Sequence, residues 1–187
     1  MFQETCKQSM TYLPIPRDMQ PMTCNPSIRK AVYEKDLDTL YDLINNENGK
    51  DIYIDTWKRL GHDKYASRVK WYMDNMWVWE IDEKIIGCVS VFGEEKYDRI
   101  IKSVQVLTVH HAYQGQGIGT KLMDFAESGG GFIEVYVYDT HECVMDFFKK
   151  RGYTMGESVQ ISDRVPPDCL FDPNTKAISF SKDMSVT

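Results

Sequence analysis

The sequence has no long apolar run, and this absence excludes several classes of protein. No stretch approaches the roughly 20 apolar residues that a membrane-spanning helix needs. The N-terminus also lacks the continuous apolar segment of a signal peptide. We therefore expect a soluble, cytoplasmic protein without a membrane partner.

Paired cysteines and metal-binding spacings are also missing. The five cysteines are scattered and include no Cys-x-x-Cys pair, which favours reduced thiols over a disulfide framework or a zinc site. Of the four histidines only His110 and His111 are neighbours, and adjacent side chains tend to point apart. The sequence predicts no metal site.

Positive charge is scarce too. The chain has 22 Lys and Arg against 28 Asp and Glu, a net charge of −6, which disfavours nucleic acid as a partner because binding depends on neutralising phosphates. A hydrophobic content of 42% and 187 residues without a low-complexity tract fit one globular domain with its own core.

The first 27 residues differ from the rest. They hold four prolines and show no helical or strand period, so residues 1–27 are predicted to form an extended arm. The arm is either a loosely attached tail or a segment that docks on its own domain or on a partner, as in a homo-oligomer or larger assembly. Residues 28–187 are predicted to form the domain.

Periodicity predicts alternating helices and strands in this domain. Strands are expected at 28–32, 77–81, 85–92, 100–109, 132–138 and 175–181, with connections at 93–98 and from 157 onward. Helical patterns place Leu37, Leu40, Tyr41 and Ile44 on one stripe, Tyr65, Val69, Tyr72 and Met76 on a second, and Val144, Phe147 and Phe148 on a third.

A glycine-rich turn joins the 100–109 strand to a helix. Gly115, Gly117 and Gly119 permit positive φ and leave backbone N–H groups uncovered, so the first helical turn can receive an anion such as a diphosphate. No Gly-Lys-Ser/Thr follows, which excludes a P-loop.

This turn, Gln114-Gly-Gln-Gly-Ile-Gly119, resembles motif A (Gln/Arg-x-x-Gly-x-Gly/Ala) of the GNAT superfamily of acyl-CoA-dependent N-acyltransferases. Downstream, Phe147-Phe-Lys-Lys-Arg-Gly-Tyr153 resembles the Phe-Tyr-x-x-x-Gly-Phe signature of motif B. The resemblance covers residues 28–181. It implies an α/β (α+β) fold with a mixed sheet of about six to seven strands, a splayed central pair and about four flanking helices.

The resemblance also implies acetyl-CoA as co-substrate. The strands 104–109 and 132–138 would splay apart, and the acyl-pantetheine arm would lie between them. The diphosphate would bind the amides of the glycine turn, with Lys121 adding charge or remaining a solvated lysine. The implied cofactor-binding residues are Leu107, Thr108, Val109, Gln114, Gly115, Gln116, Gly117, Ile118, Gly119, Thr120 and Phe148.

The residues for proton transfer depart from the family pattern. The tyrosine of motif B is replaced by Phe148, and the family's asparagine seven residues earlier by His141, a hydrogen-bond partner or proton donor. At the positions of the strand glutamate stand Ser103 and Gln105. The predicted catalytic residues are His141, Glu134 and Tyr138, with His110, His111 and Tyr136 as further candidates and Cys143 as a weaker, covalent one.

Two functions follow. The first is an N-acetyltransferase acting on a primary amine of a small molecule or protein by direct attack in a ternary complex, with Trp57, Tyr65 and Trp71 as candidate acceptor contacts. The second is a GNAT-fold protein of weak or no activity, with a binding or structural role in an assembly that uses the arm.

Overall fold

A seven-stranded mixed sheet forms the centre of the fold. In this computed structural model the described residues are 26–47, 70, 73–96, 99–160 and 176–184. The sheet order is β1-β2-β3-β4-β5-β7-β6. The strands are β1 (Ser27–Lys30), β2 (Met76–Ile81), β3 (Lys84–Lys96), β4 (Arg99–Val109), β5 (Phe132–Tyr138), β6 (Thr154–Gln160) and β7 (Lys176–Asp183). The predicted fold class and strand number are confirmed.

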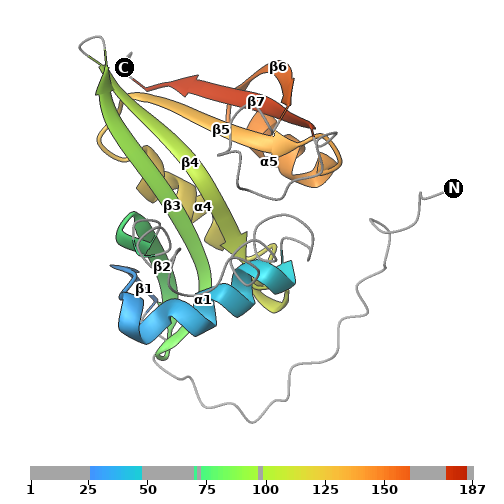
Figure 1. The fold of residues 1–187 in the computed structure, drawn as a ribbon. Helices are drawn as coiled ribbons and strands as arrows, with labels where there is room; N and C mark the ends of the chain where they lie inside the picture. Colours follow the sequence, from blue (N-terminus) through green and yellow to red (C-terminus); the bar gives the residue numbers. More distant parts are fainter. Residues whose placement is uncertain (1–25, 48–69, 71–72, 97–98, 161–175, 185–187) are drawn as a thin grey trace, which may run out of the picture.

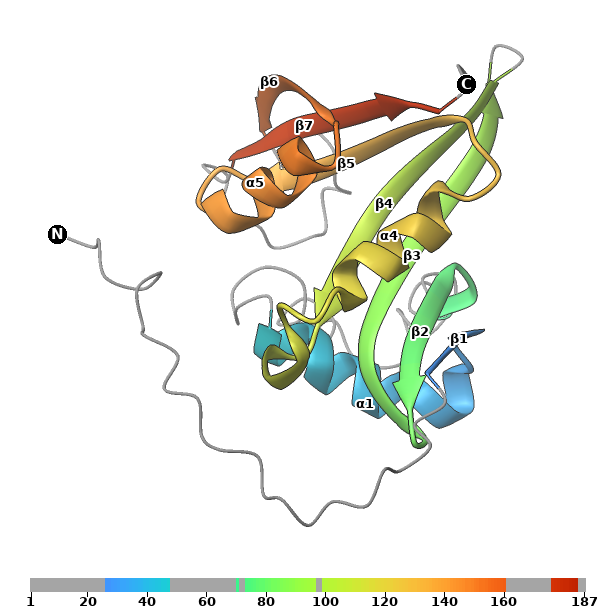
Figure 2. The same cartoon turned by 180° about the vertical axis from the view of Figure 1, so that it is seen from behind.

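Three α-helices lie on the two faces of this sheet within the described chain, slightly fewer than the four expected. The helices α4 (Ile118–Glu127) and α5 (Glu142–Lys150) cover one face, as Figure 2 shows, and α1 (Tyr33–Glu47) lies across the other. A short 3₁₀ turn, η1 (His111–Tyr113), precedes the glycine turn. No helix of the described residues is long and apolar enough to cross a membrane.

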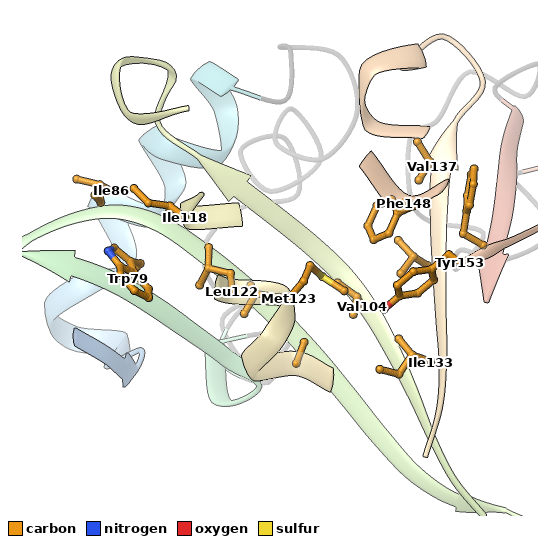
Figure 3. Packing of buried hydrophobic residues seen from close by; sticks show 14 residues of the cluster. Trp79, Ile86, Val104, Ile118, Leu122, Met123, Ile133, Val137, Phe148 and Tyr153 are labelled. Carbon is orange, nitrogen blue, oxygen red and sulfur yellow. The ribbon is translucent and has the colours of Figure 1, made fainter. Parts of the chain in front are cut away.

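The main core lies under α4 and α5. Alternate residues of β5, Ile133, Val135 and Val137, are buried there with Leu122 of α4 and Phe148 of α5. Figure 3 shows these side chains reaching across the sheet from Trp79 to Tyr153. Because strand side chains alternate between faces, the remaining residues of β5 must face the α1 side. A second core joins α1 to that side through Leu40, Leu43, Ile44 and their neighbours.

The strands β3 and β4 form a hairpin longer than expected. Residues 93–96 were predicted to be a connection, and that prediction is wrong: Gly93 pairs with Lys102 and Lys96 with Arg99. Polar residues such as Glu94 and Glu95 hide the strand period, since an exposed hairpin arm buries no face. The tight turn at Asp82 and Glu83, both with positive φ, joins β2 and β3 as a hairpin, where strands were expected at 77–81 and 85–92.

Two other expectations need correction. The loop expected from residue 157 begins with strand: β6 pairs with β7 through Gln160, and its mostly exposed residues 154–158 carry no apolar alternation. Met76 begins β2 instead of lying on a helix. The rest of that helical pattern lies largely outside the described residues, as do the candidate acceptor contacts Trp57, Tyr65 and Trp71. The arm is outside them up to residue 25, but Ser27, which was predicted to belong to the arm, begins β1.

A cluster of buried ionic groups joins α4, α5 and β7. The Glu127 carboxylate, 8% exposed as a residue, accepts hydrogen bonds from Arg151 Nη2 at 2.9 Å, Tyr153 Oη at 3.0 Å and Lys182 Nζ at 3.3 Å. Burial acts to lower the pKa of Arg151, but its bonds to Asp124 and Glu127 outweigh burial and raise it. Burial and the Glu127 charge raise the pKa of Tyr153. The cluster therefore holds two cations and a neutral phenol on one carboxylate.

Candidate functional site

The strands β4 and β5 are paired over only part of their length. Their parallel pairing runs from Ile101–Phe132 to Val104–Val135 and ends there. Beyond it β4 continues to Val109 on β3, and β5 continues to Tyr138 on β7. The two strands diverge from this point, as Figure 1 shows, and we call the opening the split.

A bulge in β4 coincides with the start of the split. Ser90 of β3 pairs with Val106 and Val91 with Val104, so Gln105 is an extra residue without a partner in β3. A bulge bends a strand and increases its twist, which turns β4 away from β5 here. Backbone groups of β4 past the bulge that point towards β5 have no ladder partner in that strand, and a ligand amide can satisfy them.

The glycine turn follows at the open end of β4. Gly115 and Gly117 have φ of 75° and 81°, which side-chain-bearing residues rarely adopt, and a Cβ at either would meet nothing within 4 Å. Gly117 is the N-cap of α4 and provides no side-chain hydrogen bond to the first turn. The first N–H groups of α4 thus lack a side-chain cap, an arrangement that suits a diphosphate.

Predicted cofactor residues of this turn play different parts. The Gln114 side chain folds back, donating from Nε2 to the Val109 carbonyl at 2.8 Å, which fixes the turn and occupies one acceptor expected to face the cofactor. Ile118 is buried in the core and offers only its backbone. Gln116 and Thr120 are exposed, as is Lys121, which lies 5.1 Å from the Trp79 ring centroid.

Glu134 lies at the closed end of the split, directly across from Ser103. The two residues are Cα partners in the β4–β5 ladder, and their neighbours Val104 and Val135 are buried under the helices. Both side chains therefore face the α1 side, about 5 Å apart in the strand spacing. Gln105 Nε2 donates to Ser103 Oγ at 2.6 Å. The carboxylate that β4 lacks at Ser103 is present on the adjacent strand.

Tyr138 and His141 come together at the open end of β5. Their rings are 5.5 Å apart in an edge-to-face arrangement, and the His141 amide donates to the Tyr138 carbonyl at 2.9 Å. His141 is the N-cap of α5 without a side-chain capping bond. Glu134 lies four residues up the same strand face, roughly 13 Å away by strand rise. The structure thus unites two of the three predicted catalytic residues and separates the third.

The histidines after β4 are engaged elsewhere. His111 Nδ1 lies 2.8 Å from Glu47 Oε1 at the end of α1, and His110 Nδ1 accepts from the Ala112 amide at 3.2 Å. Sequence reasoning did not single out Glu47, because the contact joins residues 64 positions apart. Phe148 is 1% exposed and packs on Phe147, Tyr153 and Phe180, so its contact with a cofactor stays a prediction.

Two cysteines that form no disulfide lie among the described residues. Cys88 is fully buried in β3, and burial raises the pKa of its thiol to about 12, which keeps it protonated and unreactive. Cys143 is exposed in the first turn of α5. Nothing in the arrangement of Cys88 supports nucleophilic catalysis.

The sequence of residues 73–155 matches a family model described as "Acetyltransferase (GNAT) domain". This match confirms the resemblance stated from the two motifs. A comparison with curated proteins found no match.

Solved structures share the fold at low sequence identity. Naa50 of Arabidopsis thaliana, in complex with the bisubstrate analogue CoA-Ac-MVNAL, gives a TM-score of 0.63 at 18% identity over 84% of this chain and 98% of that one. The diaminobutyrate acetyltransferase EctA of Paenibacillus lautus, in complex with L-2,4-diaminobutyric acid and coenzyme A, gives a TM-score of 0.60 at 15% identity over 88% of this chain and 98% of that one. A chain of the NatC complex, bound to Gag peptide and CoA, gives a TM-score of 0.61 at 13% identity over 84% of this chain and 98% of that one.

Proposed function

The chain carries a GNAT domain at residues 73–155, and from that premise we propose that it is an N-acetyltransferase. It would transfer an acetyl group from acetyl-CoA to a primary amine of a small molecule or protein, by direct attack in a ternary complex. The observation that carries this proposal is the split, which opens after Val104–Val135 and leads to a glycine turn with uncapped amides.

The residues present fit acetyl-CoA. The backbone of Leu107 and the Val109 N–H, on the split side of β4, would bind the amides of its pantetheine arm, as an added strand would. The Thr108 backbone faces β3, and the Val109 carbonyl already accepts from Gln114. The amides from Gly115 to Thr120, aided by the dipole of α4, would bind its diphosphate. Acetyl-CoA supplies a thioester, whose C–S bond breaks as the new amide C–N bond forms.

Glu134 is assigned the removal of the proton from the acceptor amine, directly or through a water. Its place opposite Ser103 supports this role, because it returns a carboxylate to the part of the split where the family pattern has one. A base must lie within hydrogen-bond reach of the proton it takes or be connected to it by one water. Glu134 is half-buried on the α1 face.

His141 and Tyr138 are assigned the return of a proton to the departing thiolate. A phenyl ring at position 148 has no proton to give, whereas an imidazole and a phenol both do. Their edge-to-face contact fixes the two rings relative to one another at the mouth of the split. The pair would replace the motif B tyrosine with residues seven and ten positions earlier in the chain.

Acetyl transfer to a panel of amines tests the proposal. Small diamines, amino acids and peptides with free N-termini would be incubated with acetyl-CoA, and thiol release and acetylated product measured together. The proposal expects at least one acceptor whose acetylation depends on Glu134. Tight acetyl-CoA binding without transfer to any acceptor would instead favour the assembly role, whose arm lies outside the described residues. The acceptor class, the cytoplasmic location and any oligomer stay predictions.

A further inference from the structure

Glu47, His110 and His111 bring three metal-binding side chains together beside the glycine turn. One donor atom from each lies within 4.8 Å of the other two. Glu47 comes from the last turn of α1, and the histidines follow β4, so the cluster joins segments 64 residues apart. It involves none of the residues assigned to proton transfer.

The sequence suggested that the two histidine side chains point apart, but in the structure they lie together. Their rings stack with centroids 4.3 Å apart and planes at 25°. Alternation applies to an extended strand, but the chain leaves β4 at Val109 and enters η1 at His111, which turns the two side chains to the same side. Their ring faces therefore lie against one another, and one nitrogen of each ring lies within 4.8 Å of a Glu47 oxygen.

The surroundings hold these donors in place. The Glu47 side chain is only 7% exposed, whereas His111 is 75% exposed, so a nearly buried carboxylate faces an open imidazole. Gln114 Nε2 lies 3.4 Å from the second Glu47 oxygen and 2.8 Å from the Val109 carbonyl. A ligating carboxylate is commonly oriented by such an outer hydrogen bond. The Ala112 amide likewise restrains His110 through its bond to Nδ1.

Two imidazoles and one carboxylate are a donor set that Zn²⁺ and its first-row neighbours favour. Metal-to-ligand distances of about 2.0–2.2 Å place two ligand atoms on a tetrahedral ion roughly 3.4 Å apart, so small side-chain rotations suffice from a 4.8 Å cluster. A dication would replace the direct contact between Glu47 and His111. Three protein ligands leave one position open to solvent.

We propose that Glu47, His110 and His111 form a binding site for a first-row transition-metal dication such as Zn²⁺. The bound ion fixes the C-terminal end of α1 to the segment that leads into the glycine turn. A simple ion pair between Glu47 and His111 has no need of His110, so the contribution of His110 separates the two interpretations.

Calorimetric titration of the full chain with Zn²⁺, without acetyl-CoA or an amine, tests the site. The native chain should bind one ion that raises its melting temperature, because ligand binding to the folded state alone stabilises it. Loss of an outer hydrogen bond to a metal ligand costs roughly tenfold to a hundredfold in metal affinity, so loss of a ligand in His110→Ala, His111→Ala or Glu47→Ala should cost about a hundredfold or more. His141→Ala is the matched control and should bind as the native chain does.

Absorption spectra with Co²⁺ distinguish this site from the cysteines. Nitrogen and oxygen ligands give weak visible bands, whereas thiolate ligands add a strong near-ultraviolet band. Binding that survives all three ligand variants, or that carries the thiolate band, would overturn the proposal, as would the absence of stoichiometric binding. Because neither measurement uses acetyl-CoA, failure here is distinct from failure of the transferase proposal.

Discussion

The two sides of the split are built in opposite ways. On the β4 side the proposed contacts with acetyl-CoA are backbone groups, set by a bulge at Gln105 and by positive φ at Gly115 and Gly117. On the β5 side the proposed proton carriers are side chains, Glu134, Tyr138 and His141. A site built from backbone groups depends on chain conformation, so it can be identified in the sequence by its glycines. In a site built from side chains, a functional group can instead be supplied by a neighbouring strand, so its position in the sequence can differ.

The largest effect is expected on kcat, from a substitution on the β5 side of the split. Glu134→Gln should reduce kcat by about 10²–10⁴-fold, because general-base catalysis typically contributes that much, while acetyl-CoA affinity stays native. Steady-state kinetics with the best acceptor, paired with calorimetry, measure the two quantities. Glu142→Gln, an exposed carboxyl at the start of α5, is the matched control and should keep native kcat. Native kcat in Glu134→Gln would remove Glu134 from the mechanism.

The next largest effect is expected on stability, from the ionic cluster around Glu127. Glu127→Gln should lower the free energy of unfolding by roughly 3 kcal/mol, since Arg151 and Lys182 lose their buried anion. Urea denaturation measures this change. Asp124→Asn removes the second carboxylate that Arg151 binds. Because the Asp124 side chain is 61% exposed, this change should cost less than about 1 kcal/mol. Equal costs would show that burial at Glu127 contributes nothing.

A smaller, pH-dependent effect is expected at α1, away from the split. Arg29 binds Asp36 through two hydrogen bonds of 2.6 and 3.0 Å, and the Val32 amide donates to the same carboxylate at 2.8 Å. Burial acts to raise the pKa of Asp36, but these bonds outweigh it and lower the pKa. A lowered folded-state pKa stabilises the fold above the unfolded value, near 3.9, and this stability is lost as pH falls through the folded pKa.

Asp36→Asn should therefore cost about 1–3 kcal/mol at neutral pH, the range for hydrogen bonds to a charged group. The difference from the native chain should shrink as pH falls below about 4. Denaturation curves at pH 7 and at pH 3 provide both values. A difference that is constant with pH would contradict the pairing, and a change in acetyl-CoA affinity would show that α1 and the split are coupled.

The smallest effect is expected at Cys143. Direct attack in a ternary complex needs no acyl-enzyme, so Cys143→Ser should retain native kcat. Mass spectrometry should find an alkylating reagent on exposed Cys143 and none on buried Cys88, whose pKa is raised to about 12. An acetylated Cys143 that forms and decays during turnover would contradict direct attack.

The sequence predicts the backbone half of the site better than the side-chain half. Glycine spacing and apolar period predict the turn and the start of α4, and the bounds of β5 agree at both ends. Sequence-distant contacts have no local signal: neither the pairing of Ser103 with Glu134 nor that of His111 with Glu47 follows from spacing. Exposed strands such as β6 are missed for a related reason, because they bury no face and so have no period.

Acetyl-CoA calorimetry on two tryptophan variants tests the backbone-built site most directly. Gly117 and Gly152 have φ of 81° and 80°, and a Cβ at either meets nothing within 4 Å, so Gly117→Trp and Gly152→Trp carry the same backbone strain. Only Gly117 borders the proposed diphosphate site. Two lost charge-assisted hydrogen bonds, at about 1.5–3 kcal/mol each, correspond to about a hundredfold weaker binding or more. The account predicts that loss in Gly117→Trp with native affinity in Gly152→Trp; native affinity in Gly117→Trp would contradict it.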